Sequence, residues 1–378
     1  MTQDETVHDI LIVGGGINGC AIAREAALHG LSVLLVERDA LAAHTSSKSS
    51  KLIHGGLRYL EFYDFKLVRE ALQERERLLR LAPGLVRPVA FVLPHVHAPR
   101  AAWMVRVGLW LYDTIGGHSS VPHARALRRD DTAYQAPFER PLRGFVYYDA
   151  MVDDAALTRA YAADAVANGA VVREGAGVTA AQRTADAWHV TLSDGSQVAA
   201  RMLVNAAGPW VAELLGTLGV SSRAGVRLVK GSHITVPRLY DGDHAYLLQQ
   251  PDRRVVFAFP WQGQTAIGTT DVAVATPDDP AISADETDYL CTAADRYFRR
   301  QLTPADVTGS WSGIRALYDD GASEARAVTR DYVLERDDDG APVLSVFGGK
   351  ITTARALAED VLAKLGYTDP VSRERPTG

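Results

Sequence analysis

The feature that most constrains the fold is a glycine-rich turn near the N-terminus. Gly14, Gly16 and Gly19 form the pattern G-x-G-x-x-G directly after the apolar run of residues 10–13. A short continuous apolar run is typical of a buried parallel strand, and the pattern of residues 17–29 predicts a helix that ends at a glycine. In such a unit the glycines permit a tight turn, the approach of a pyrophosphate and close packing of the helix on the sheet.

A second apolar run, residues 31–36, is closed by Glu37, which completes a strand–turn–helix–strand unit. An acid at this point can accept hydrogen bonds from a ribose hydroxyl, so the unit predicts dinucleotide binding. It does not by itself distinguish FAD from NAD. Two later segments favour FAD, because residues 205–208 end a strand with small side chains and Gly348-Gly349 open the last predicted helix.

Composition excludes several classes of protein. A formal net charge of −6 argues against nucleic-acid binding, which favours a basic excess. Two distant cysteines, Cys20 and Cys291, provide no disulfide framework and suit a reducing cytoplasm. The N-terminus has no signal-peptide pattern, and we find no run of the roughly 18 apolar residues that a membrane span requires.

The pattern along the chain predicts an α/β (α+β) fold with a discontinuous cofactor domain. Helices are predicted at residues 65–81 and 154–168, and short alternating strands occupy residues 227–271. We therefore expect a Rossmann-like dinucleotide-binding domain with an inserted, mainly antiparallel substrate domain. The expected boundaries are 1–82, 141–218 and 328–370 for the first domain, 83–140 and 219–327 for the second, and 371–378 for a polar tail, with disorder expected from residue 370 onward.

Several motifs, taken together, resemble one known family. They are GGGINGC at 14–20, TSSKSSKLIHGGLRYLE at 45–61, KGSHI at 230–234, IGTTD at 267–271, WSGIRAL at 311–317, TRDY at 329–332 and SVFGGKITT at 345–353. This set resembles the FAD-dependent, quinone-linked (aerobic type) glycerol-3-phosphate dehydrogenases, within the glycine/D-amino-acid oxidase-like flavoproteins. Members of that family usually carry a further helical C-terminal domain, most of which this sequence lacks, so dimerisation and docking to an electron acceptor stay open.

The resemblance implies FAD as cofactor and sn-glycerol 3-phosphate as substrate. The implied reaction is hydride transfer from C2 to flavin N5, which gives dihydroxyacetone phosphate, with electrons passed to membrane quinone. It also implies a set of cofactor-binding residues: Gly14, Gly15, Gly16, Asn18, Gly19, Glu37, Arg38, Ser46, Ser47, Lys51, Leu52, Ile53, Val178, Ala207, Gly208, Trp210, Gly349, Ile351 and Thr352.

A phosphomonoester near its dianionic form needs several cationic donors in one pocket. Within the matching motifs the candidates are Arg58, Arg330 and Lys350, with Tyr59 as a neutral donor and Thr269 as a lining residue. The alternative for each arginine is an ordinary surface charge paired with an acid. Within HGGLRY and TRDY we favour the phosphate role.

Oxidation of an alcohol also needs a base and a group that stabilises the developing alkoxide. Arg315 in WSGIRAL is the candidate for holding that oxygen, and His54 and His233 are the candidates for the base. Either histidine can equally be structural, so the choice between them stays open. No metal site is predicted, because His95 and His97 lack nearby acids or cysteines.

Residues 100–116 combine tryptophans and aliphatic residues with two arginines. The segment fits either an interfacial membrane helix or a buried helix with arginines at its edge. The resemblance favours the membrane, which predicts a cytoplasmic enzyme held peripherally on the inner face of the cell membrane. The alternatives for the whole chain are an oxidase that uses oxygen, an amino-acid or hydroxy-acid oxidoreductase, and a catalytically silent flavin-binding module. A homodimer is also left open.

Overall fold

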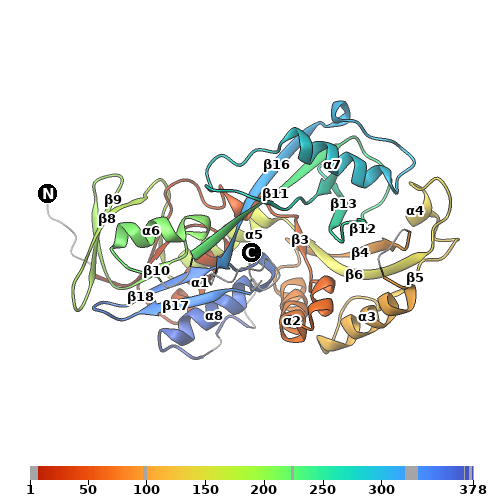
Figure 1. Cartoon of the computed structure of the whole chain (residues 1–378). Helices are drawn as coiled ribbons and strands as arrows, with labels where there is room; N and C mark the ends of the chain where they lie inside the picture. The colour runs from red at the N-terminus through yellow and green to blue at the C-terminus, as the bar shows by residue number, and fades with distance from the viewer. Residues whose placement is uncertain are drawn as a thin grey trace.

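The computed structural model describes residues 7–96, 100–222, 225–319, 331–369, 371–373 and 377. Figure 1 shows an elongated molecule in which two β-sheets form the two halves, joined by the long strands β11 (Gly225–Val236) and β16 (Gly309–Asp319). The predicted α/β fold with a second, mainly antiparallel sheet is confirmed.

The first sheet has the order β17-β18-β10-β1-β2-β7, and its central pairs β18–β10, β10–β1, β1–β2 and β2–β7 are parallel. β9 and β8 extend it as antiparallel strands beside β10. Its strands are β1 (Val7–Val13), β2 (Val33–Val36), β7 (Val171–Arg173), β8 (Val178–Arg183), β9 (Trp188–Leu192), β10 (Gln197–Asn205), β17 (Val333–Asp337) and β18 (Val343–Phe347).

Both faces of this sheet are covered, which explains why β1 is a continuous apolar run. Ile10 and Ile12 pack in one core cluster with α1 (Ile17–Leu28), α5 (Asp154–Ala167) and α8 (Ala354–Lys364). Leu11 and Val13 pack in another cluster, which includes residues of α6 (Val211–Leu218) and of β8 and β9.

The second sheet has the order β15-β11-β14-β13-β12-β4-β6-β3, with β16 beside β11 and β5 beside β6. All its pairs are antiparallel except β12–β4. Its further strands are β3 (Leu52–Ile53), β4 (Val86–Pro94), β5 (Arg125–Ala126), β6 (Gly144–Val152), β12 (Ala245–Gln249), β13 (Val255–Trp261), β14 (Gln264–Gly268) and β15 (Val272–Ala273).

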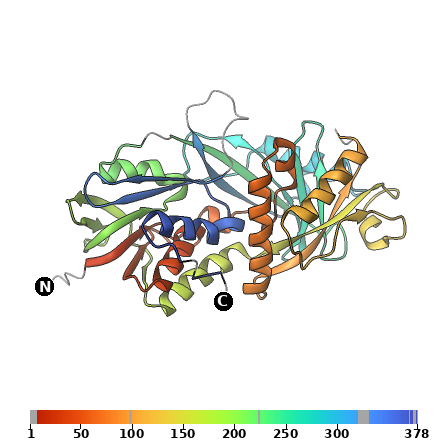
Figure 2. The ribbon, with the colours of Figure 1, turned by 90° about the horizontal axis from the view of Figure 1, so that it is seen from below.

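Helices cover the second sheet from both sides. α7 (Ala284–Asp295) packs on one face, while α2 (Phe65–Leu81) and α3 (Ala102–Ile115) pack on the other. Seen from below, α2 and α3 lie side by side on the same side of the molecule as α8 (Figure 2). The remaining short helices are α4 (Thr132–Gln135), η1 (Thr45–Ser47), η2 (Leu57–Phe62), η3 (Gly208–Trp210), η4 (Pro304–Asp306) and η5 (Ile351–Thr353).

The strand pairing moves two of the expected domain boundaries. β3 and β6 were placed in the cofactor domain by the boundaries at 82 and 141, yet both pair in the second sheet. β6 pairs with β4 along its whole length, so the return to the cofactor half comes after β6, where α5 begins.

The expected disorder from residue 370 onward is wrong for the residues of this segment that the structure describes. Ser372 is fully buried, and its hydroxyl contacts Arg355 of α8. The backbone N–H of Thr377 donates to the carbonyl oxygen of Leu81 at the end of α2. These contacts place the described part of the tail against α2 and α8.

A buried polar network attaches α3 to the second sheet. The hydroxyl of Tyr112 donates to the carboxylate of Asp149 on β6. The same carboxylate accepts a hydrogen bond from the guanidinium of Arg75 on α2. The same hydroxyl accepts the backbone N–H of Gly55 at 2.7 Å. Because buried polar groups need partners, this network holds α2, α3 and the segment after β3 together.

Candidate active site

The glycine-rich turn is built on close backbone contacts. Gly14 has a φ of +117°, and a Cβ added to it would lie 2.5 Å from the carbonyl oxygen of Ala206 at the end of β10. A Cβ on Gly19 would overlap the carbonyl oxygen of Gly14. Only glycine fits either position, and the turn leaves the N-terminus of α1 directed at the carboxyl edge of the sheet, where a pyrophosphate binds.

Glu37 lies buried at the end of β2, as predicted. Its carboxylate accepts the backbone N–H groups of Gly15 at 2.6 Å and Asp39 at 2.9 Å. It therefore stabilises the turn and stands where the ribose of a dinucleotide would reach it. Glu37, Asp39 and His44 are the one group in the described part of the chain with a metal-like spacing of ligand atoms. The bonds to backbone N–H groups give the Glu37 carboxylate a structural role without a metal.

Several other predicted cofactor residues lie around the same edge. The guanidinium of Arg38 lies 4.1 Å from the ring centroid of Trp210, and the His44 ring lies 4.7 Å from it. Trp210 ends η3, which begins at Gly208 and follows Ala207 shortly after β10. Val178 begins β8 and is half-buried.

Residues 45–51 form a loop between the two sheets. The hydroxyl of Ser46 accepts the first helical N–H of α1, that of Ile17, at 2.8 Å. Lys51 is also a predicted cofactor contact. Its ammonium lies 2.7 Å from the carboxylate of Asp154 and forms an ion pair with it. The loop, with Ser47 in η1 and Leu52 and Ile53 in β3, is therefore fixed at both ends.

The last predicted cofactor segment meets the first one in space. The side chain of Asn18 donates to the carbonyl oxygen of Gly348, and a Cβ on Gly349 would lie 2.5 Å from the Asn18 amide nitrogen. Ile351 and Thr352 follow in η5, immediately before α8. The turn, the loop 45–51 and the Gly348-Gly349 segment thus surround one edge of the first sheet, an arrangement that fits a long dinucleotide such as FAD.

Three glycines form a low floor on the second sheet. A Cβ on Gly231 of β11 would lie 2.5 Å from the Arg315 guanidinium and 2.6 Å from the Thr269 hydroxyl. A Cβ on Gly268 would overlap the His233 ring, and one on Gly313 would lie 3.0 Å from the backbone of Lys48. These glycines are needed because other groups approach the sheet closely.

His233 lies over this floor, on the same face as Arg315. Its register partners are Gly268 on β14 and Trp311 on β16, and its ring stacks on Trp311 at 4.8 Å. Its Nε2 lies 2.9 Å from the hydroxyl of Ser50 in the loop 45–51. Burial, followed by the charges of Arg315 and Lys51, lowers the pKa of His233 to about 3, so the ring is neutral at pH 7.

His54 lies near β13, the strand beside β14 in the second sheet. Its ring is 6.1 Å from that of Phe257, which pairs with Gly268 in the sheet. Burial, and then the charge of Lys350, lowers the pKa of His54 to about 4. Both candidate bases are therefore neutral proton acceptors at working pH.

The predicted phosphate-binding residues are partly assembled. Lys350 has a buried ammonium with no hydrogen-bond partner among the described residues, and it lies 4.5 Å from the ring centroid of Tyr59. Arg58 and Tyr59 share η2, directly after the segment that carries His54. Arg330 lies outside the described residues.

Arg315 is held by the turn after β14. Its Nη2 donates to the carbonyl oxygen of Thr270 at 2.8 Å and pairs with Asp271 at 2.7 Å. Asp271, Trp311 and Ser50 were not singled out from the sequence, nor were the three floor glycines. All six lie inside the quoted motifs, so the motif spacing was the signal that could have found them.

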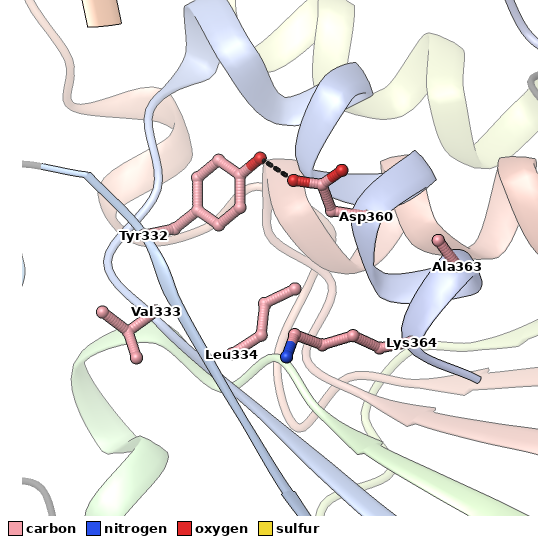
Figure 3. Close-up of a pocket in the computed structure, with 6 residues that line it drawn as sticks. All are labelled: Tyr332, Val333, Leu334, Asp360, Ala363 and Lys364. Carbon is pink, nitrogen blue, oxygen red and sulfur yellow. Dashed lines mark hydrogen bonds between the residues drawn. The ribbon is translucent and has the colours of Figure 1, made fainter. Parts of the chain in front are cut away.

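A separate hollow lies away from these residues, between β17 and α8 (Figure 3). It is lined by Tyr332, Val333, Leu334, Asp360, Ala363 and Lys364. The Tyr332 hydroxyl points to Asp360 and donates to it at 2.5 Å. None of the predicted site residues lines this hollow, so it is separate from the candidate active site.

Comparison with known proteins agrees with this arrangement. The profile of a family described as FAD dependent oxidoreductase matches residues 9–355. A glycerol-3-phosphate dehydrogenase of Pseudomonas aeruginosa is 50% identical over 369 residues, which cover 95% of this chain and 72% of that protein. A D-erythritol 1-phosphate dehydrogenase of Brucella abortus is 48% identical over 380 residues, which cover 98% of this chain and 76% of that protein.

The crystal structure of the glycerol-3-phosphate dehydrogenase from Bacillus halodurans, complexed with FAD, superimposes with a TM-score of 0.72 at 26% identity. The match covers 100% of this chain and 67% of that one. The chain belongs to the FAD-dependent oxidoreductase family, and FAD is the cofactor that its nucleotide-binding edge is built to hold. Within it, the chain belongs to the glycerol-3-phosphate dehydrogenase family that its motifs resemble.

The depressed pKa of His233 has a consequence for stability. Its pKa is about 3 in the folded protein and 6.5 as a reference, so between these pH values the unfolded chain binds more protons. Stability therefore falls as the pH decreases through this window, by about 2 kcal/mol from this residue between pH 7 and pH 5. Urea unfolding of His233→Gln should show a pH dependence that is smaller by this amount.

The exposed His189 on β9 provides the matched control, because His189→Gln removes a histidine that has no such burial. An unchanged pH dependence in His233→Gln would show that His233 is not held neutral in the folded protein.

Proposed function

We propose that this protein oxidises sn-glycerol 3-phosphate to dihydroxyacetone phosphate, with FAD as the acceptor of the hydride. The observation that carries the proposal is the set formed by Lys350, whose buried ammonium has no hydrogen-bond partner among the described residues, Arg315 and two neutral histidines beside the cofactor loops. The family membership of the chain supports the same reaction.

The phosphate is assigned to the side of the site that holds Lys350. A buried ammonium needs an anionic or hydrogen-bonding partner, and a phosphomonoester supplies both. Arg58 and Tyr59 on the adjacent η2 are the further donors. His54 belongs to this side, because Lys350 is the charge that acts on it. Arg330 completes the proposed set.

The C2 hydroxyl is assigned to the opposite side, beside Arg315 and His233. Arg315 donates to the C2 oxygen and stabilises its developing negative charge, while His233 accepts its proton. His233 is the candidate base on this side, because it is the histidine on which the charge of Arg315 acts. Bound FAD supplies the acceptor for the hydride that leaves C2. Thr269, above Gly231, lines the same side.

The first test is the substitution Arg315→Ala in the flavin-loaded protein. Loss of the group that stabilises the alkoxide should slow flavin reduction by about 10²–10³-fold. The measurement is the anaerobic bleaching of flavin absorbance after addition of sn-glycerol 3-phosphate. Arg201→Ala removes an exposed arginine of β10 and should bleach at the wild-type rate.

A flavin that stays oxidised in the wild-type protein would contradict the proposed activity and would favour a silent flavin-binding module. Bleaching by a D-amino acid or a hydroxy acid, without a response to sn-glycerol 3-phosphate, would favour those substrate classes instead.

A larger phosphorylated polyol is the second candidate substrate. The observation that favours it is the 48% identity to the protein named D-erythritol 1-phosphate dehydrogenase, close to the 50% of the first relative. Both substrates carry a phosphate and secondary hydroxyls, so the same cations serve both. We expect kcat/KM to be higher with sn-glycerol 3-phosphate than with D-erythritol 1-phosphate in the same bleaching assay. The reverse order would assign the protein to the larger polyol.

We also propose that α3 docks on an anionic membrane, at the inner face of the cell membrane, where quinone accepts the electrons. Trp103, Met104, Val107 and Trp110 are exposed on α3, with relative residue exposures of 67%, 48%, 54% and 65%. The opposite face of the helix, with Val105, Leu109 and Tyr112, is buried on the second sheet. The helix thus has one buried face and one exposed apolar face, and the exposed face supports the membrane alternative for this segment.

Neighbouring residues extend this surface. Phe62, Tyr63 and Phe65 at the junction of η2 and α2 are exposed, and Lys66 and Arg106 are exposed cations beside them. Exposed aromatic residues with basic residues at their margin suit the interface of an anionic bilayer. Among the described residues, no helix has the length and apolar character needed to cross a membrane.

The membrane proposal predicts that the double variant Trp103→Ser/Trp110→Ser binds vesicles more weakly. Loss of two interfacial indoles should reduce partitioning onto vesicles of phosphatidylglycerol and phosphatidylethanolamine at least about tenfold. Co-sedimentation measures the bound fraction. Val166→Ser/Val171→Ser, which alters two exposed valines of α5 and β7, is the control and should bind as the wild type does. Equal binding of all three proteins would contradict docking through α3.

The acceptor is tested separately from the membrane. Quinone reduction on vesicles without hydrogen peroxide supports the dehydrogenase, whereas stoichiometric hydrogen peroxide in air would assign the protein as an oxidase.

A further inference from the structure

A buried carboxylate on the far face of the second sheet is connected to the candidate active site. Glu286 lies in the first turn of α7 and is 6% exposed. One carboxylate oxygen accepts the hydroxyls of Thr270 at 2.6 Å and Ser232 at 2.9 Å. The other accepts the backbone N–H of Ser283 at 2.9 Å and lies 2.8 Å from the ammonium of Lys230.

Burial alone would raise the pKa of Glu286, but hydrogen bonds, above all those from Lys230 and Thr270, lower it to about 2. The side chain is therefore an anion that only accepts hydrogen bonds. Because the single hydroxyl proton of Ser232 goes to this anion, Ser312 must donate in the 2.8 Å contact between the two serines. The carboxylate thus fixes the donor in each of these hydrogen bonds: Ser312 on β16 donates to Ser232 on β11, and Ser232 donates to Glu286.

Thr270 is fixed even more tightly. While its hydroxyl donates to Glu286, the same oxygen accepts the backbone N–H of Ser232 at 2.9 Å, and the Thr270 N–H donates back to the Ser232 carbonyl oxygen. Every polar group of Thr270 then has a defined partner, since its own carbonyl oxygen accepts Nη2 of Arg315 at 2.8 Å. Glu286 is therefore linked to Arg315 by hydrogen bonds through a single residue, Thr270.

We propose that Glu286 is a positioning residue that holds the turn carrying Thr269 and Thr270 in register with β11, and thereby holds the Arg315 guanidinium toward the C2 oxygen of the substrate. This inference rests on the proposed function. Glu286 touches neither substrate nor cofactor and acts only through Thr270 and Arg315. It lies in none of the motifs on which the family resemblance was based.

The substitution Glu286→Gln keeps the size of the side chain and removes its charge. A glutamine amide has one acceptor oxygen and one donor nitrogen, so it cannot accept from both pairs of donors at once. If the oxygen stays with Lys230, the NH2 group faces the hydroxyls of Thr270 and Ser232, and Thr270 loses its acceptor. The turn and the carbonyl oxygen that holds Arg315 then lose their fixed position.

The experiment is a double-mutant cycle between Glu286 and Arg315 in the flavin-loaded protein, with anaerobic flavin reduction by sn-glycerol 3-phosphate as the readout. We expect Glu286→Gln to lower the limiting reduction rate about 10–100-fold while the apparent Kd for the substrate changes less than about threefold, because the interaction matters most as charge develops. In an Arg315→Ala background the same substitution should change the rate less than about twofold.

Three further variants separate positioning from folding. Thr270→Val should lower the rate as Glu286→Gln does, and Thr270→Ser, which keeps the hydroxyl, should restore it. Ser283→Ala removes the hydroxyl that caps α7, which accepts the Glu286 N–H at 3.2 Å, and leaves the carboxylate contacts in place. This control should lower the melting temperature without changing the reduction rate more than about twofold.

A wild-type rate in Glu286→Gln, or an equal loss in the Arg315→Ala background, would overturn the positioning role. So would equal losses in Glu286→Gln and Ser283→Ala. If the wild-type flavin is not reduced by sn-glycerol 3-phosphate at all, the proposed function fails, and the positioning role in that reaction falls with it.

Discussion

The buried ion pair between Lys51 and Asp154 holds the segment on which both halves of the molecule meet. Asp154 begins α5, which packs on α1, and its carboxylate also accepts the N–H and the hydroxyl of Ser49. From this point the loop 45–51 contacts both sheets. Removing one member of such a pair leaves a buried charge without a partner, which costs about 3–5 kcal/mol. The pair is therefore a condition for the site.

The contacts of this loop extend in two directions. Toward the first sheet, the Ser46 hydroxyl accepts the first helical N–H of α1, beside the glycine-rich turn. Toward the second sheet, the Trp311 indole donates to the carbonyl oxygen of Ser49, and the Thr45 hydroxyl donates to that of Ile314. The nucleotide-binding edge of the first sheet and the face of the second sheet that carries His233 are consequently positioned by the same few residues. The glycine floor then lets the loop and the side chains approach the sheet closely enough to form one site.

Local patterns predicted the parts of the fold that depend on nearby residues. The unit from β1 to β2 follows from its apolar runs and glycines, and the helix at residues 65–81 follows from its amphipathic period and was found at these bounds. The membership of β6 could not be predicted, because its apolar sequence fits either sheet and only pairing with β4 decides it. Glu286 was missed for a similar reason, since its partners Lys230, Ser232 and Thr270 are distant in sequence.

The part of the candidate site that lies within the quoted motifs could be proposed from the sequence. Arg315, His233, His54 and Lys350 were selected by residue type and resemblance, whereas the proposed division of the site into two sides rests on the strand register and the neighbouring charges. The role of Gly268 is a further example. In the sequence it resembles any glycine before a turn, whereas in the sheet it makes room for the His233 ring.

The segments that form the nucleotide-binding edge are far apart in the sequence, and this couples cofactor binding to folding. Its segments come from distant parts of the sequence, at Gly14, at Gly208 and at Gly349, and they come together only when the first sheet has formed. An unfolded chain thus has no partial site, and free FAD at a hundred times its dissociation constant would stabilise the folded state by about 2.7 kcal/mol. The cellular supply of flavin then becomes a determinant of how much folded protein persists.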